Sequence, residues 1–474
     1  MNRHTKLRTM AMLVGVVGSS ACASVFADGF KDPLPDTLSF AGVTIYGTVD
    51  VGYAYQSEGV PLNSKYVGGL EYQAFTTTRN FSGSVSTLAE SGMEQSKIGL
   101  LVDRAFADDF KIVARLETGF NPLSASLTDA CAALADNSSL PQGKQTANAD
   151  SSRCGQPFNS QAFGGVSSKT YGTLTIGRHN SLQLDALSQY DPQVLSYAFS
   201  FLGYSGFDGG AGSTQAARWD NSAKYVYANG PYHVAVMYSS GGADIGILDR
   251  AYAAEVGGSV AGLSLDAVYE RANGAVNLRS SFDNNKVYPL PTPGLAAYIS
   301  DDTSWNLMGK YTIPLGTPAD KVTMFAGYSH IQKSHSSDST GAAEGDYPLS
   351  IGININNSAE YNLEWVGAKL ELASGLKLTG AYYHVTQNSW TIGVGPTGNN
   401  GIGCAGAGLL CAGDFNEASF SADYVFNKHY DVYAGVNYSQ VTDGLANGFV
   451  GTTKDGNTGS ENQTTVMVGF RVKF

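Results

Sequence analysis

Apolar and polar residues alternate with a period of two along most of this chain, which is typical of half-buried β-strands. The clearest case is the last segment, where one face carries Val466, Val468, Phe470, Val472 and Phe474 and the other carries Met467, Gly469, Arg471 and Lys473. Beyond the N-terminal region, no window approaches the run of about eighteen apolar residues that a spanning helix needs. The pattern therefore predicts an all-β chain.

The alternating segments come in pairs, with a short turn within each pair and a longer loop between pairs. We predict about sixteen strands, an even number that can close into a transmembrane antiparallel β-barrel. Their approximate ranges are 43–55, 96–104, 110–119, 161–168, 173–178, 218–227, 232–238, 251–260, 263–271, 303–313, 321–332, 360–372, 376–387, 415–426, 430–442 and a closing strand from 462.

The N-terminal residues have the basic, apolar and small-residue regions of a secretory signal peptide. Val25-Phe26-Ala27 fits the cleavage rule, so we expect a signal peptide over residues 1–27 and one barrel domain over 28–474. Cleavage after Ala23 is the second possibility. A lipoprotein signal at Cys22 would want Leu three residues earlier, where the chain has Ser19.

Composition supports a membrane barrel rather than a soluble domain. Charged residues make up only 15% of the chain, although the mean hydropathy is near neutral at −0.12. A barrel strand presents only every second residue to lipid, so a low charged fraction and a near-neutral mean hydropathy are both expected of a membrane barrel.

The net charge of −12 becomes −15 when the three positive charges of residues 1–27 are removed. Such an acidic chain is not expected to bind nucleic acid.

Four stretches give the chain a family resemblance: 43–50 (VTIYGTVD), 96–100 (SKIGL), 171–178 (YGTLTIGR) and 218–225 (RWDNSAKY). With these stretches the chain resembles the general porins of Gram-negative bacteria, of the β-proteobacterial and neisserial type. The resemblance implies a homotrimer of sixteen-stranded barrels in outer-membrane lipid, passing ions and small polar solutes. It also implies a third outer loop folded into the lumen. Phe470, Val472 and the terminal Phe474 resemble the signal that the barrel-assembly machinery recognises.

That loop is expected between residues 180 and 217, where it would narrow the pore. We predict a constriction in which loop carboxylates face basic wall residues and create a transverse field. The acidic candidates are Asp185, Asp191 and Asp208, and the basic candidates are Lys97, Arg115, Arg178, Arg218 and Lys224. Asp50, Glu117, Asp266 and Glu270 also point inward by parity, which favours cations.

The cysteines fit an oxidising compartment. Sequence proximity favours pairing Cys131 with Cys154 and Cys404 with Cys411, each pair within one outer loop. A metal site is the alternative, but no histidine lies near either pair at ligand spacing. We therefore predict neither a metal nor a cofactor.

No catalytic motif is recognised, and we predict a passive diffusion channel that is not an enzyme. A substrate-selective channel or adhesin is one alternative, with the loops at 120–160 and 334–359 performing the recognition. An outer-membrane barrel enzyme is the other, and it would need His233 or His384 as its base.

Overall fold

A computed structural model of the protein describes residues 34, 35, 37–66, 68, 70, 83–137, 146–147, 153–203, 217–242, 246–247, 249–279, 295–337, 343–344, 347–393, 412–443 and 459–474. Over these residues the chain forms a closed antiparallel barrel of 16 strands. The predicted signal peptide, residues 1–27, lies outside the described residues, so its cleavage stays a prediction.

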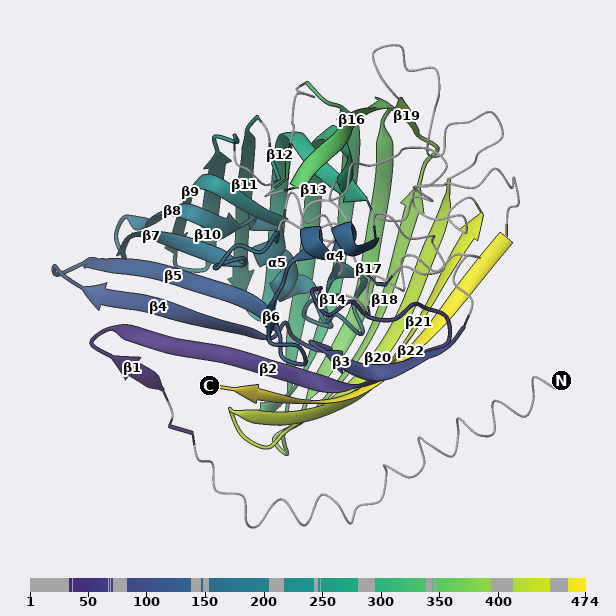
Figure 1. The fold of residues 1–474 in the computed structure, drawn as a ribbon. Helices are drawn as coiled ribbons and strands as arrows, with labels where there is room; N and C mark the ends of the chain where they lie inside the picture. The colour runs from purple at the N-terminus through teal and green to yellow at the C-terminus, as the bar shows by residue number, and fades with distance from the viewer. Residues whose placement is uncertain are drawn as a thin grey trace.

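Each strand of the wall pairs with the next along the chain, and the last pairs with the first (Figure 1). Fifteen wall positions hold one strand each, and one position holds β3 and β4 in succession. The bounds are β2 Val43–Gln56, β3 Val85–Glu90, β4 Lys97–Ala105, β5 Phe110–Asn121, β7 Gln161–Ser168, β8 Gly172–Asn180, β9 Arg218–Asn229, β10 Tyr232–Ser239, β11 Ala251–Val260, β12 Leu263–Arg279, β13 Leu295–Leu315, β14 Thr317–His335, β17 Ala359–Glu371, β18 Leu376–Gln387, β20 Gly413–Val425, β21 Tyr430–Asp443 and β22 Gly459–Lys473.

The barrel closes at the C-terminal strand. Val51 of β2 lies opposite Phe470 of β22, and the register runs on to Thr48 opposite Lys473. One residue further, Phe474 and Gly47 exchange both backbone hydrogen bonds, at 2.9 and 3.1 Å. The terminal residue is therefore part of the seam that leaves the sheet without an edge.

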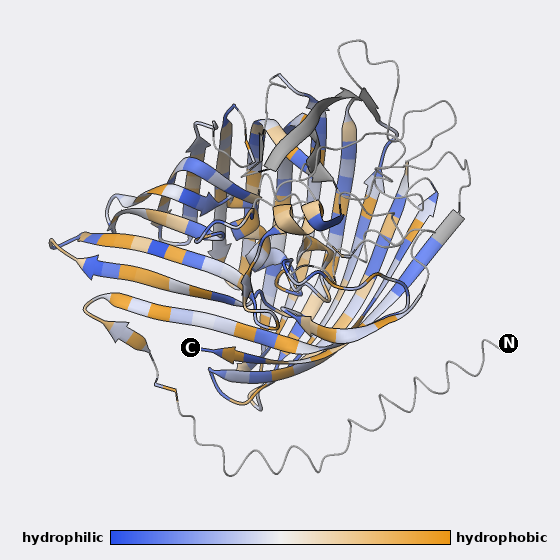
Figure 2. Ribbon diagram, in the orientation of Figure 1, coloured by the Kyte–Doolittle hydropathy of each residue, from blue (hydrophilic) through white to orange (hydrophobic). Residues whose placement is uncertain are grey.

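The wall alternates as the sequence predicts. Tyr53 is 54% exposed on the outside, whereas its neighbour Ala54 is 1% exposed on the inside. Along β22, Val468 and Phe470 are exposed, while Met467 and Arg471 are buried within the barrel. Figure 2 shows the resulting bands of apolar and polar residues along the strands. The exposed apolar faces form the surface that suits lipid.

Short turns and long loops occupy opposite ends of the barrel. The turns include Phe106 to Asp109, Ala261 to Gly262 and Leu372 to Gly375.

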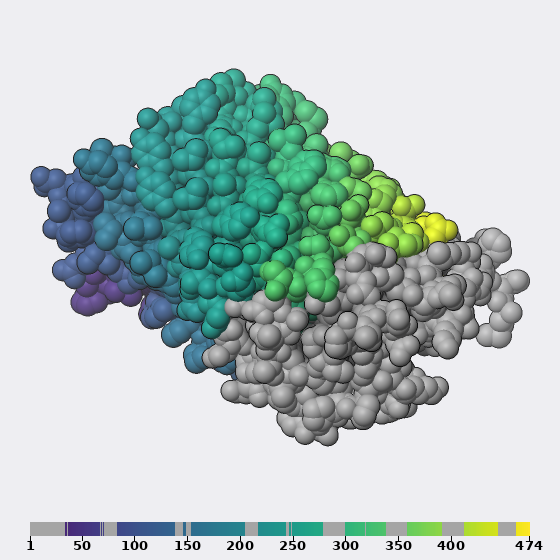
Figure 3. All heavy atoms as spheres, turned by 90° about the horizontal axis from the view of Figure 1, so that it is seen from above, coloured from purple at the N-terminus to yellow at the C-terminus, as the bar shows by residue number. Residues whose placement is uncertain are grey.

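All sixteen predicted strands are confirmed, with ends that shift by a few residues, and β12, β13 and β14 run well beyond their predicted ends. In the space-filling view, the colour passes steadily from blue through teal to yellow across the described surface, as expected for strands that neighbour each other in chain order (Figure 3).

The sequence pattern missed strand β3, since the strand predicted for this wall position begins only at residue 96. β2 pairs with β4 along its first half and with β3 along its second half. Between them, Ser91 has a left-handed backbone (φ 59°). The N–H groups of Met93 and Glu94 leave the ladder and donate to Asp50 Oδ2, both at 2.8 Å. A carboxylate from the neighbouring strand thus stabilises the break.

The remaining elements are short or lie outside the wall: β1 Leu38–Phe40, β6 Ser126–Leu127, β15 Ala343–Glu344, β16 Tyr347–Asn357, β19 Thr391–Gly393, the α-helices α4 Ala130–Asn137 and α5 Leu182–Tyr190, and the 3₁₀-helix η2 Phe201–Gly203. None of the helices in the described part of the chain is long and apolar enough to cross a membrane.

Candidate functional site

The third outer loop, between β8 and β9, lies inside the barrel. Its helix α5 begins at Ser181, whose side chain accepts a hydrogen bond from Leu184 N and so caps the first turn. The buried residues Leu182, Ala186, Leu187 and Tyr190 recur at helical spacing and form one apolar face. This face packs into a core of inward wall residues that includes Trp219, Val268, Met308 and Trp365. Burial of this face holds the loop against the wall.

Polar contacts fix the same helix to the far wall. The backbone N–H of Gln183 donates to Glu270 Oε1 at 2.8 Å, and its side-chain amide bonds Asn306 at 3.0 Å and Ser304 at 2.6 Å. At the other end of the helix, Trp365 Nε1 donates to Tyr190 O at 3.0 Å. The prediction of an inward third loop is confirmed over its described part, 181–203.

Asp191 caps the C-terminus of α5 and organises the rest of the loop. Its carboxylate accepts hydrogen bonds from Tyr383 OH at 2.5 Å, Ser200 Oγ at 2.6 Å and Leu195 N at 2.6 Å. The residue is only 1% exposed. Burial raises the pKa of Asp191, while the hydrogen bonds from Ser200 and Tyr383 oppose this rise. Asp191 therefore anchors the loop to β18, which differs from the predicted role of facing the pore.

Asp185 does face a basic wall residue. Its Oδ2 lies 2.5 Å from Lys224 Nζ on β9, and its Oδ1 accepts from Asn180 Nδ2 at 3.0 Å. The Asp185 side chain is 44% exposed, whereas that of Lys224 is 11% exposed. The two charges are in direct contact, so they largely cancel each other at a distance.

Arg178 and Arg218 lie at the two ends of the same loop. Arg178 Nη1 pairs with Asp220 Oδ1 at 2.6 Å, and Nη2 donates to Asn159 O at 2.9 Å. Arg218 lies in the electrostatic neighbourhood of Arg153 and Arg178, and its Nε has no hydrogen-bond partner among the described residues. Three guanidinium groups therefore gather on one side of the lumen.

Tyr197, from the inward loop, lies against this group of arginines. Although burial raises it, the pKa of the Tyr197 phenol is lowered overall by the charges of Arg153 and Arg218 and by a hydrogen bond with Arg153. Arg153 Nη2 also donates to Gln95 Oε1 at 2.8 Å, and the residue is 2% exposed. The loop thus contacts basic residues through the Tyr197 phenol as well as through the Asp185 carboxylate.

Arg115 and Lys97 extend the basic wall onto β5 and β4. The Arg115 guanidinium lies 5.7 Å from the ring centroid of Tyr46, a cation–π contact. Lys97 Nζ pairs with Glu94 Oε1 at 2.9 Å. We call the set of Lys97, Arg115, Arg153, Arg178 and Arg218 the basic wall.

Arg153 was missed by the sequence analysis, which places it in an outer loop. Cys154 was the available signal, because the predicted disulfide between Cys131 and Cys154 is present and ties this segment to helix α4. Arg153 O also accepts from Ala130 N at 2.7 Å, at the start of that helix. Asp208, Cys404 and Cys411 lie outside the described residues, so their roles stay predictions.

Three of the four inward carboxylates that favoured cations, Asp50, Glu117 and Glu270, accept hydrogen bonds from the wall or the loop. Asp50 is 0% exposed, and Oδ1 accepts from Tyr433 OH at 2.6 Å. Glu117 Oε2 accepts from Tyr46 OH at 2.8 Å, and Glu270 caps Gln183 as described above. These carboxylates hold the wall and the loop together.

Comparison with known proteins decides the family. The family described as Gram-negative porin matches residues 9–444. The chain belongs to this family. A comparison with curated proteins found no match.

Among solved structures, the porin is similar to the anion-selective porin from Comamonas acidovorans, at 16% identity and a TM-score of 0.53, covering 91% of this chain and 99% of that one. It is also similar to OmpT, an outer membrane protein of Vibrio cholerae, at 14% identity and a TM-score of 0.53, covering 93% and 100% of the two chains.

At these identities the two structures show the fold alone. Family membership supplies the function: the porin is a channel of the bacterial outer membrane for passive diffusion of small solutes. The alternating wall gives this function its physical basis, because it presents apolar side chains to lipid and polar ones to the lumen.

Proposed function

We propose that this porin is a general diffusion channel whose narrowest part lies between the inward loop and the basic wall, and that this part favours anions. The observation that carries the proposal is the grouping of Arg153 and Arg218 at Tyr197, with Arg178 beside Arg218. Guanidinium groups stay charged at all relevant pH values. A narrow opening beside them attracts anions and repels cations.

The pairing of the carboxylates supports this preference over the cation preference expected from parity. Asp185 is neutralised by Lys224, and Asp191 is buried within the loop. Among the described residues, the basic wall and Lys224 supply six basic groups, and the carboxylates that neighbour them are Glu94, Glu117, Asp185 and Asp220, apart from the buried Asp191. The excess positive charge lies on the arginines.

The test is the reversal potential of the reconstituted porin under a salt gradient. Removing one positive charge about 7 Å from the ion path changes the energy of its interaction with a passing ion by roughly 0.6 kcal/mol in a water-like dielectric. This energy corresponds to a change of about two- to threefold in the ratio of anion to cation permeability. We expect Arg218→Gln and Arg153→Gln each to shift the ratio towards cations by about this factor. Lys111→Gln is the control, because Lys111 pairs with Asp103 at an exposed turn. Unchanged ratios in both arginine variants would refute the proposal.

We further propose that three copies associate in the membrane, with support from the resemblance to general porins. Measured in mild detergent, the mass of the particle should equal three chains and should fall to one chain on heating. A particle of one chain before heating would contradict the trimer.

We also propose that the barrel has no enzymatic activity. His384 Nδ1 bonds Asn416 Oδ1 at 2.9 Å, and His233 Nε2 faces two carboxylates, so in the described part of the chain neither histidine is paired with a serine. Ester or peptide hydrolysis by the purified porin, lost on substitution of either histidine, would contradict this. Block of the current by one solute at saturating concentration would instead favour the substrate-selective channel.

A further inference from the structure

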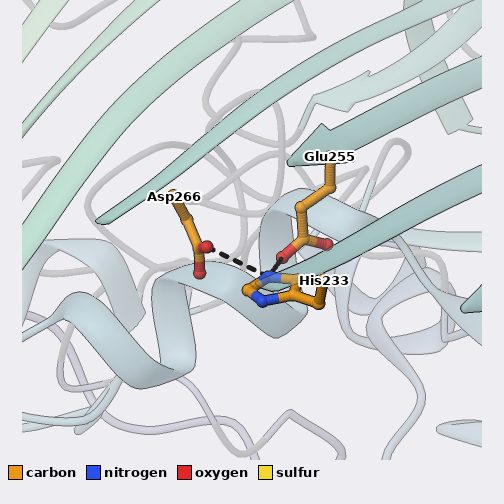
Figure 4. A group of neighbouring side chains, drawn as sticks. All are labelled: His233, Glu255 and Asp266. Carbon is orange, nitrogen blue, oxygen red and sulfur yellow. Dashed lines mark hydrogen bonds and ion pairs between the residues drawn. The ribbon is translucent and has the colours of Figure 1, made fainter. Parts of the chain in front are cut away.

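Three potential metal ligands meet on the inner wall, away from the arginines. His233 of β10, Glu255 of β11 and Asp266 of β12 come from three neighbouring strands. Figure 4 shows the two carboxylates converging on the imidazole. Their ligand atoms all lie within 4.8 Å of one another. We propose that these residues form a binding site for a divalent transition-metal ion such as Zn²⁺.

The distances fit a metal of this kind. His233 Nε2 lies 3.0 Å from Asp266 Oδ1 and 3.3 Å from Glu255 Oε1. For a tetrahedral ion with ligands at about 2.0 to 2.1 Å, neighbouring ligand atoms are about 3.3 Å apart. One imidazole and two carboxylates suit Zn²⁺ and its neighbours in the first transition row, and the fourth position would remain for water.

Asp266 provides a second, independent sign of a ligand. Its side chain is 2% exposed, and apart from the ionic contact with His233 Nε2 at 3.0 Å, Oδ1 accepts no hydrogen bond among the described residues. A buried carboxylate oxygen without a hydrogen bond is costly. A coordinated cation would satisfy it. Tyr190 of α5 hydrogen-bonds the same carboxylate and would orient it, as outer-shell partners of metal ligands do.

Gly257 makes the approach of His233 and Asp266 possible. It lies between them in the sheet, opposite His233 in β10 and opposite Asp266 in β12. A Cβ at this position would overlap Asp266 Oδ1 and would come within 2.5 Å of His233 Cε1. The absence of a side chain therefore leaves the space in which the ligand atoms meet.

The charge of the three residues and their accessibility from the lumen are also consistent with a metal site. When a cation binds, the two carboxylates can supply two negative charges, which a divalent ion neutralises. The nearest lysines have other contacts: Lys224 pairs with Asp185, and Lys310 lies 5.0 Å from the Tyr190 ring centroid. The His233 side chain is 30% exposed, and it lies close to the short β9–β10 turn. The ion would enter from that end of the lumen.

The test is metal binding by the chelator-treated full-length mature porin in detergent. Titration with Zn²⁺ alone, followed by calorimetry, should give one site per chain, and Co²⁺ alone should give the visible absorption of a low-coordinate nitrogen and oxygen site. His233→Gln and Asp266→Asn should each weaken binding at least about tenfold. His384→Gln is the matched control, since this histidine faces outward and bonds Asn416, and it should bind as the unmodified protein does.

A second measurement distinguishes loss of the metal site from misfolding of the variant. Zn²⁺ added to the side of the short turns should shift the reversal potential of the unmodified porin and leave that of His233→Gln unchanged, while both conduct. Absence of Zn²⁺ binding, or equal binding by His233→Gln, would overturn the proposal. The three residues would then form only an ion pair, between a protonated histidine and its two carboxylates. Because binding is measured separately from selectivity, failure of the proposed anion preference leaves this test intact.

Discussion

At the scale of single residues, the role of a loop carboxylate depends on its partners rather than on its place in the sequence. Asp185 and Asp191 are six residues apart on one loop. The first reaches a lysine on the wall, whereas the second accepts hydrogen bonds from its own loop and from Tyr383. Sequence reasoning treats the two alike, because burial and hydrogen bonding are set only once the loop has entered the barrel.

The anchor role of Asp191 predicts that Asp191→Ala loosens the loop. Removing the carboxylate leaves buried donors at Leu195, Ser200 and Tyr383 without a partner, at a cost of about 1–3 kcal/mol each. We expect the barrel to fold and the loop to become accessible, so limited proteolysis should cleave within 191–203. Tyr383→Phe removes one donor and should have a smaller effect. Equal protease resistance of Asp191→Ala and the unmodified porin would contradict the anchor.

The ion pair between Asp185 and Lys224 predicts a gain of positive charge in the lumen when Asp185 loses its charge. In Asp185→Asn the Lys224 ammonium is no longer neutralised, so the lumen gains one positive charge. Anion permeability relative to cations should rise about two- to threefold, measured by reversal potential. The increase should shrink at high salt, where the charge is screened. An unchanged ratio, or a shift towards cations, would contradict this role of Lys224.

At the scale of elements, the strands were predictable and their interruptions were not. All sixteen strands follow from the two-residue period, because each strand has one apolar and one polar face over most of its length. The gap between β3 and β4 depends on Asp50, some forty residues earlier in the chain, which accepts the freed N–H groups. The sequence pattern predicts a loop where helix α5 forms, since the apolar residues of this helix acquire a packing partner only inside the barrel.

The same contrast holds for the candidate site. Parity predicts that Lys97, Arg115, Arg218 and Lys224 point inward, because side-chain direction is a local property of a strand. For Arg178, at the end of its strand, parity does not predict a direction. Arg153 was not predicted, because it reaches the lumen only through the fold of the second outer loop. His233, Glu255 and Asp266 carry no motif, since their proximity depends on the register of three strands.

The disulfide between Cys131 and Cys154 should stabilise this second loop rather than the barrel. The bond closes a segment with a sequence separation of 23, and such bonds typically contribute about 2–4 kcal/mol. In Cys131→Ser we expect the barrel to keep its thermal transition while residues near Arg153 become accessible to protease. Reduced unmodified porin should behave in the same way. Loss of the folded barrel in the variant would contradict a local role.

The closing strand makes a separate prediction. Phe474 exchanges two backbone hydrogen bonds with Gly47 at the seam. Deleting Phe474 should remove these bonds and the terminal aromatic, and the amount of porin assembled in the outer membrane should fall severalfold. Val472→Ala, which shortens an outward side chain and keeps the backbone pairing, should have a weaker effect. Normal assembly without Phe474 would refute its role as a signal.

At the scale of the whole molecule, two features together make a selective passage. A closed sheet satisfies its own backbone hydrogen bonds and can span lipid with its outward apolar side chains. The inward loop packs on an apolar core that includes Trp219 and Trp365, and its Tyr197 lies against Arg153 and Arg218. The passage that we propose lies between this loop and the basic wall.

The most direct test of this account is the single-channel current of the purified porin in a planar lipid bilayer. We predict stepwise currents that increase with salt concentration, and we predict that uncharged sugars pass at rates that fall steeply with their size. Correctly folded porin that inserts into the bilayer and conducts no ions would contradict the account.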